Sequence, residues 1–186
     1  MPTYDATDPQ PFSLQPQEND AMARHYDRWS AVFSKCGLFR YELLRTVRDA
    51  SGPMVMVMGN NPSKAGASTD DQTIRRLRQL CPSNGFRGFG MYNAGALIST
   101  DPAGMLTAKD PVGPDNRAML ETAIYDYEAV IIAWGGIKGP LQAEKEWFLD
   151  LARVHQRRLL CFGFTGDHEP RHPSRLPRTA RLEAFS

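Results

Sequence analysis

Side chains that could bind or transform a ligand follow four separate apolar segments of the sequence. Asn60, Asn61, Ser63 and Asp71 follow the first segment, Tyr92 and Asn93 the second, Trp134 the third, and Arg171, His172 and Ser174 the fourth. An Asn amide offers one donor pair and one acceptor, which suits a planar polar ligand. Carboxylate and imidazole groups can exchange protons with such a ligand. The sequence therefore predicts a polar site of nucleobase size with catalytic candidates Asn61, Asp71 and His172.

Each of these residues also has a purely structural interpretation, which the sequence leaves open. The Asn60-Asn61-Pro62 run is typical of a turn, and Trp134 is typical of a core. Asp70 is expected to be the N-cap of a helix that extends to about Cys81. Convergence of several segments is a stronger indication of a site than any one residue.

The segments that must position these residues alternate between the two regular types. Apolar runs predict strands at 39–47, 53–59, 85–92, 129–134 and 158–164. Helical spacing and start signals predict helices at 20–33, 70–81, 113–127 and 141–154. This alternation favours a single three-layer α/β/α domain with a mostly parallel central sheet. Ligands of such sheets bind beyond the carboxyl ends of the strands, where the candidate residues fall.

Composition limits the class of protein without naming a function. The chain has 186 residues, 22 basic and 21 acidic side chains, and three widely spaced cysteines. These values fit one globular domain in a reducing compartment, and we expect a cytoplasmic protein with no membrane partner. Residues 1–19 are expected to be a flexible arm, 20–177 the domain and 178–186 a tail. The oligomeric state stays open.

Several common catalytic motifs are missing from the sequence. It contains no GxxxxGK[ST] phosphate loop, no GxGxxG after a strand and no GxSxG elbow. Their absence disfavours a nucleotide hydrolase, a nicotinamide dehydrogenase and an α/β-hydrolase. The spacing of acidic and histidine residues gives no positive case for a metal, and we expect no cofactor.

A series of short motifs in matching order resembles the DUF1643 family of uncharacterised bacterial and phage proteins. They are Arg40-Tyr41, Asn61-Pro62-Ser63, Asp70 to Arg76, Tyr92-Asn93, Thr100 to Pro102, Asp110 to Asn116, Ala133 to Gly135 and Pro170 to Pro173. The resemblance covers about residues 33–177. Asn60 and Ser174 depart from it, since both stand where that family usually has Leu.

A more remote resemblance links the chain to the uracil-DNA glycosylase superfamily. The segments that show this resemblance are Gly59-Asn60-Asn61-Pro62, the predicted strand 131–135 and His172-Pro173-Ser174. The resemblance implies a glycosylase-like fold, with Asn61 positioning a water and His172 donating to a base carbonyl. Asn93 would read the base, Tyr92 or Trp134 would stack on it, and Arg75, Arg175 and Arg178 would contact nucleic-acid phosphates.

Three functions are compatible with these residues. The first is a DNA glycosylase-like hydrolase that cleaves the N-glycosidic bond of a flipped or modified base. The second is a non-catalytic module that binds a nucleotide or modified base in the same site. The third is a phage DNA-base-modifying enzyme on the same scaffold. The expected partner is therefore a nucleobase, a nucleotide or DNA.

Overall fold

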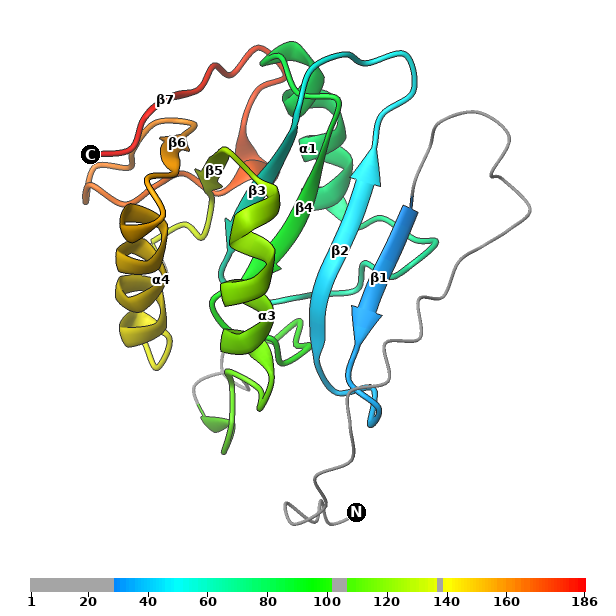
Figure 1. Ribbon diagram of the computed structural model, residues 1–186, viewed down its shortest axis with the longest axis vertical. Coiled ribbons are helices and arrows are strands. Elements are labelled where there is room, and N and C mark those ends of the chain that lie inside the picture. The colour runs from blue at the N-terminus through cyan, green and yellow to red at the C-terminus, as the bar shows by residue number, and fades with distance from the viewer. Residues whose placement is uncertain (1–28, 102–106, 137–138) are drawn as a thin grey trace.

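A computed structural model of the chain describes residues 29–101, 107–136 and 139–186. Seven strands form one sheet in the order β1-β2-β4-β3-β5-β6-β7 (Figure 1). The strands are β1 Trp29–Phe33, β2 Arg40–Thr46, β3 Met54–Gly59, β4 Gly88–Asn93, β5 Ala129–Ile132, β6 Arg158–Cys161 and β7 Glu183–Ala184. The helices are α1 Gln72–Ser83, α3 Asn116–Ala123 and α4 Gln142–Val154, with short 3-10 helices η2 Ile124–Asp126 and η3 Pro173–Arg175.

The sheet is mixed, with a parallel centre and antiparallel edges. Strands β4, β3, β5 and β6 run parallel to one another, whereas β1 with β2, β2 with β4 and β6 with β7 pair antiparallel. Three of the six pairings are therefore antiparallel, and the expectation of a mostly parallel sheet is not confirmed. A parallel pair needs a long crossover, whereas the short segment between Phe33 and Arg40 lets β1 and β2 pair antiparallel as a hairpin.

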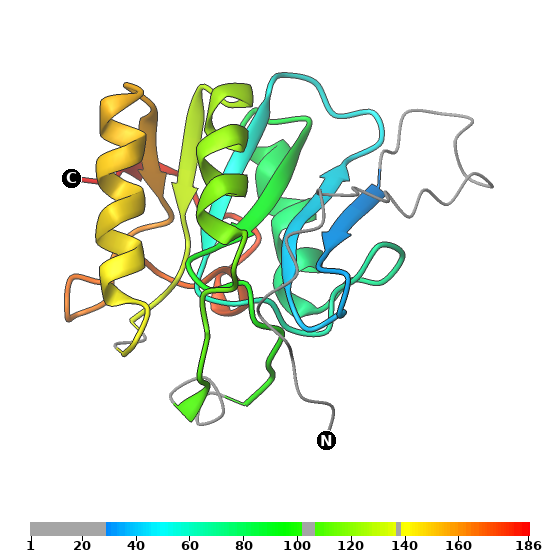
Figure 2. The ribbon, with the colours of Figure 1, turned by 60° about the horizontal axis from the view of Figure 1, so that its bottom comes forward.

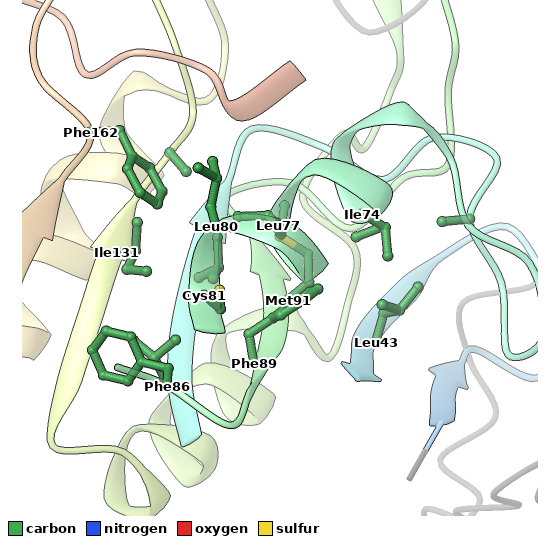
Figure 3. Close-up of a cluster of buried hydrophobic side chains, with 14 of the residues drawn as sticks. Leu43, Ile74, Leu77, Leu80, Cys81, Phe86, Phe89, Met91, Ile131 and Phe162 are labelled. Atoms are coloured by element: carbon green, nitrogen blue, oxygen red, sulfur yellow. The ribbon is translucent and has the colours of Figure 1, made fainter. Parts of the chain in front are cut away.

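Helices cover both faces of the parallel centre (Figure 2). On one face, Ile74, Leu77 and Leu80 of α1 pack on the apolar residues of β3, β4 and β5 (Figure 3). On the other face, Leu120 of α3 and Phe148 of α4 pack on the alternate residues of the same strands. Strands covered on both faces need apolar residues at every position, which explains the unbroken run Met54–Met58.

Two local predictions are wrong. A helix was expected at 20–33, yet Trp29–Phe33 is the edge strand β1, and residues 20–28 lie outside the described part. The helical spacing of aromatic residues there gave way to pairing with β2. Asp71, not Asp70, is the N-cap of α1, because its carboxylate accepts from the amide of Ile74. Asp70 instead bonds the side chains of Arg45 and Arg78.

The C-terminal segment runs along α1 before it joins the sheet. Gln72 at the start of α1 donates to the main-chain oxygen of Ser174, and Asn84 after its end donates to that of Ala180. The chain then enters β7, a strand that the sequence analysis does not predict. A two-residue strand carries too little apolar pattern to be recognised. This course places η3, and with it His172, beside the N-terminus of α1.

None of the helices in the described ranges has the length and apolar character that crossing a membrane requires.

Candidate functional site

The parallel register brings the ends of three strands together at one edge of the sheet. Gly59 at the end of β3 pairs with Asn93 at the end of β4. The amide of Ala133, just after β5, donates to the main-chain oxygen of Met58 in β3. The order of strands reverses at β3, since β4 lies on one side and β5 on the other. Ligands of open α/β sheets bind at such a reversal, outside the carboxyl ends.

Asn93 is the most unusual polar residue at this edge. It is only 1% exposed, and neither its Nδ2 nor its Oδ1 has a hydrogen-bond partner in the described structure. Burying an amide without partners costs about 1–3 kcal/mol, so such a residue calls for an explanation. Gly59 makes room for it, because a Cβ at Gly59 would lie 2.7 Å from the Asn93 Oδ1. The neighbouring strand is therefore shaped around this side chain.

Asn116, the first residue of α3, holds the end of β4 in place. Its Nδ2 donates to the main-chain oxygens of Asn93 and Ala94, each over 3.1 Å. The residue is 1% exposed, so these bonds satisfy a buried amide. The turn before it is fixed by Asp110, whose carboxylate accepts from the amides of Val112 and Gly113. The 110–116 motif therefore positions the backbone of Asn93.

Arg40 reaches the same edge through a β-bulge at the start of β2. Val32 of β1 pairs with Glu42 but Phe33 pairs with Arg40, so Tyr41 is an extra residue. Tyr41 and Glu42 consequently both face the α3 side, where they bond Asp115 and Tyr92. The bulge turns Arg40 to the α1 side, where its Nη1 donates to the main-chain oxygen of Ala65 over 2.9 Å. Its Nε is buried without a partner.

Asp71 links the N-terminus of α1 to both Arg40 and His172. Burial lowers the pKa of Arg40 to about 10, and the charge of Asp71 opposes this shift. Burial also lowers the pKa of His172, again against the charge of Asp71, with Arg175 adding to the lowering. The charge of the Asp71 carboxylate therefore acts on both a guanidinium and an imidazole. The hydrogen bond from Gln72 to the main-chain oxygen of Ser174 places the N-terminus of α1, where Asp71 lies, beside the segment that follows His172.

The imidazole of His172 is held by Ser174. Its Nδ1 accepts from the main-chain amide of Ser174 over 3.4 Å, with the Ser174 hydroxyl 2.8 Å away. A neutral ring that accepts at Nδ1 carries its proton on Nε2. Gly135, with a φ of 72°, lies against the base of the His172 side chain, since a Cβ there would be 3.2 Å from the His172 Cβ. His172 therefore stands between the end of β5 and the start of α1.

The turn after β3 has a partly structural role. The Nδ2 of Asn61 donates to the main-chain oxygens of Pro62 and Ser99, and its Oδ1 accepts from Asn60. The third predicted catalytic residue thus fixes two loops to each other. Asn60 lies at the carboxyl edge, and its Oδ1 is buried without a partner. Ser63 is half-buried in the same turn.

The two aromatic residues predicted to stack on a ligand lie in the core of the opposite face. Tyr92 is buried against Tyr127, with its hydroxyl on Glu42. Trp134 packs on Phe185 and beneath the ammonium of Lys145. Trp134 lines a cavity of about 170 Å³ beside α4, together with residues that include Lys145, Glu146 and Glu169. Alternation along β4 separates Tyr92 from Asn93, because successive side chains point to opposite faces.

The predicted phosphate-binding arginines are exposed. Arg175 and Arg178 extend from the segment that follows His172, and Arg75 lies on the first turn of α1, where it donates to the main-chain oxygen of Asp70. Arg171 is exposed as well, with its Nε bonded to the main-chain oxygen of Phe164. Arg75 and Arg175 lie near His172, whereas Arg178 stands two residues before Ala180, which contacts Asn84 beyond the other end of α1.

Sequence reasoning does not single out Arg40 or Asn116 as site residues. Arg40 is the first residue of β2, where a basic residue is typical of a solvent-exposed strand end. Only the bulge turns its side chain inward. Asn116 stands after Gly113-Pro114-Asp115, where an amide reads as part of a helix start. Their positions inside matching family motifs were the available signal. Within the described ranges, no three His, Cys, Asp or Glu side chains are grouped so that they could hold a metal ion.

The fold and this edge define a mixed α/β protein with a polar, partly unsatisfied site at the end of its parallel strands. Residues 40–174 match DUF1643, a family described as a protein of unknown function, and the chain belongs to that family. The match begins at Arg40 and ends at Ser174, so it contains all the residues that line the edge. Comparison with curated proteins and with solved structures gives no match.

Proposed function

We propose that this protein is a nucleobase-recognising enzyme that hydrolyses an N-glycosidic bond. The buried Asn93 amide, with its donor and its acceptor both unpaired, is the observation that carries the proposal. A nucleobase edge presents adjacent donors and acceptors in one plane, and an Asn amide can bind such an edge with two hydrogen bonds. The free Oδ1 of Asn60 adds a further acceptor at the same edge.

The acidic and imidazole groups supply the remaining chemistry. In this scheme the Asp71 carboxylate takes a proton from a water molecule, whose oxygen forms a new bond to the sugar C1′. The C1′–N bond breaks, and its electron pair leaves with the base. The Nε2–H of His172 donates a hydrogen bond to the carbonyl oxygen of the departing base. Asn61 holds the turn next to Asn60, and its Oδ1 can also orient the water.

The scaffold supports a relation to the uracil-DNA glycosylase superfamily. Four central strands are parallel, helices pack on both faces, and the polar turn after β3 and the His172 segment meet the same edge. We propose on this basis a glycosylase-like, three-layer arrangement to which β1, β2 and β7 are antiparallel additions. The free thiols of Cys36, Cys81 and Cys161 support a reducing, cytoplasmic location.

The proposed substrate is a nucleic acid or a nucleotide. Arg175 and Arg75 lie exposed near His172, where they could bind phosphates flanking the base, and the exposed Arg178 could bind a phosphate farther along the strand. A base in a duplex would have to be extruded to reach Asn93. Binding through these arginines would weaken steeply as the salt concentration rises.

A second candidate is a binding module that recognises a nucleobase without chemistry. The structural roles of Asn61 and Asp71 favour it, because one holds two loops and the other caps α1. A module would need only Asn93, Asn60 and His172.

A base-release assay separates the two candidates. The protein is incubated with oligonucleotides and nucleotides that contain normal and modified bases, and free base is measured by chromatography. If the protein is an enzyme, the wild type releases free base and Asn93→Leu does not. Asp71→Asn also releases no base, but it still binds the substrate. Binding without release from any substrate supports the module, and no binding at all contradicts both.

A further inference from the structure

The charged side chains grouped around the N-terminus of α1 are more positive than negative among the described residues. Arg45 and Arg78 both bond the carboxylate of Asp70, at 2.9 and 3.1 Å. Asp71 is the carboxylate that acts on Arg40, and it is also the one that acts on His172. These described groups thus comprise three guanidinium ions and two carboxylates, with a neutral His172 and the further cation Arg175 nearby. Among the described residues, Asp71 is the carboxylate whose charge opposes the lowered pKa of Arg40, and its charge also acts on Arg45 and His172.

Arg40 is also incompletely hydrogen-bonded. The residue is 2% exposed, its Nη1 donates to the main-chain oxygen of Ala65, and its buried Nε has no partner in the described structure. A buried guanidinium is expensive unless an anion neutralises it and accepts its protons.

Arg40 and Asn93 lie on the same side of the sheet at the same edge. The β2–β4 register, continued from Leu43 opposite Met91, places the start of β2 beside the end of β4. The amide of Arg40 donates to the main-chain oxygen of Ala96, two residues beyond Ala94. Arg40 and Asn93 together contribute three of the seven buried polar side-chain atoms that lack a partner among the described residues. Unpaired groups on the same face of adjacent strands indicate a missing ligand.

We infer that Arg40 is an anion-binding residue of this site and that the protein binds its nucleobase as the ring anion. The inference rests on the proposed function and names the form of the base that the site selects. A base leaves as an anion when the C1′–N bond breaks with its electron pair, so the Arg40 guanidinium would stabilise the leaving group. Asn93 would read the edge of the ring, and Arg40 would neutralise its charge.

Binding of free bases to the full-length protein tests the inference by calorimetry between pH 7 and 9. The probes are two pairs that differ in the acidity of a ring N–H, uracil with 5-fluorouracil and hypoxanthine with xanthine. If the anion binds, affinity rises about tenfold per pH unit below the pKa of the base, and the more acidic member of the pair binds more tightly. Arg40→Met removes this pH dependence and weakens binding at least tenfold, whereas Arg40→Lys retains part of both. Arg48→Met, at an exposed arginine, changes neither.

The outcomes separate this inference from the proposed function. If some base binds the wild type, and Asn93→Leu abolishes binding, but affinity does not change with pH, the anion inference is wrong and nucleobase recognition stands. If no base binds at any pH, the proposed function fails first. The pH series on the wild type needs no variant, so misfolding of Arg40→Met cannot hide the result.

Discussion

The side-chain amide of Asn116 donates to the main-chain oxygen of Asn93 over 3.1 Å, while the side chain of Asn93 itself has no partner among the residues that the structure describes. Two buried asparagines thus lie next to each other with opposite roles. The Nδ2 of Asn116 donates both of its hydrogen bonds to the main chain at the end of β4. Asn93 is held by its backbone and keeps its amide unpaired, as expected for a residue that binds something else.

We expect Asn93→Leu to leave the protein as stable as the wild type or to stabilise it by up to about 1 kcal/mol. An apolar side chain of similar shape removes a buried amide that makes no hydrogen bond in the folded protein. Urea unfolding measures the change, and a destabilisation of several kcal/mol would show that the Asn93 side chain has a structural partner.

Asn116→Ala is the matched variant, and we expect it to destabilise the protein by roughly 1–3 kcal/mol. It removes two hydrogen bonds and leaves the oxygens of Asn93 and Ala94 without their donor. The same urea titration measures it. A neutral effect would mean that the end of β4 is held by other contacts.

Asp70→Asn should be the most destabilising of these substitutions, by about 3–5 kcal/mol. The Asp70 side chain is 7% exposed and that of Arg45 is 0% exposed, so loss of the carboxylate leaves a buried charge uncompensated. Asp150→Asn is the control, because the Asp150–Arg153 pair is exposed and should change stability by less than about 1 kcal/mol. Equal effects of the two variants would contradict the buried-network interpretation.

Acidification should destabilise the protein partly through His172. Burial lowers its pKa below the ordinary value of 6.5, so the unfolded chain binds the proton more readily than the folded one. The stability that His172 contributes is complete above pH 6.5 and is lost as the pH falls through the folded-state pKa. Unfolding free energies of wild type and His172→Gln, measured from pH 7.5 to 5, should converge toward low pH. Parallel curves would show that His172 titrates normally, and His168→Gln controls for loss of an exposed imidazole.

Much of the architecture can be predicted from the sequence, because buried strands and amphipathic helices have distinct periods. The apolar run Met54–Met58 and the spacing of Ile74, Leu77 and Leu80 were sufficient for β3 and α1. The direction of the strands could not be predicted in the same way, because pairing partners depend on the length of connections and on tertiary contacts. For β1 the helical spacing was misleading, because one face of a strand can place aromatics at similar intervals.

The candidate site was predictable only in part. Asn93, Asp71 and His172 follow predicted strands or open a predicted helix, so strand ends pointed to them. Arg40 depends on a bulge that changes which face a side chain occupies, and no local pattern announces such a bulge. Tyr92 shows the reverse error, since it stands next to Asn93 in sequence but on the other face of the sheet.

The most direct test of the account follows the side-chain amide of Asn93 by NMR in ¹⁵N-labelled protein, with its resonances assigned by their loss in Asn93→Leu. Nucleobases and nucleotides are added in turn. We predict that at least one of them shifts the Asn93 side-chain resonances in a saturable way and leaves those of Asn116 nearly unchanged. If no nucleobase or nucleotide shifts the Asn93 side-chain resonances, the central claim is wrong. It is also wrong if every nucleobase or nucleotide that binds the protein leaves those resonances unmoved.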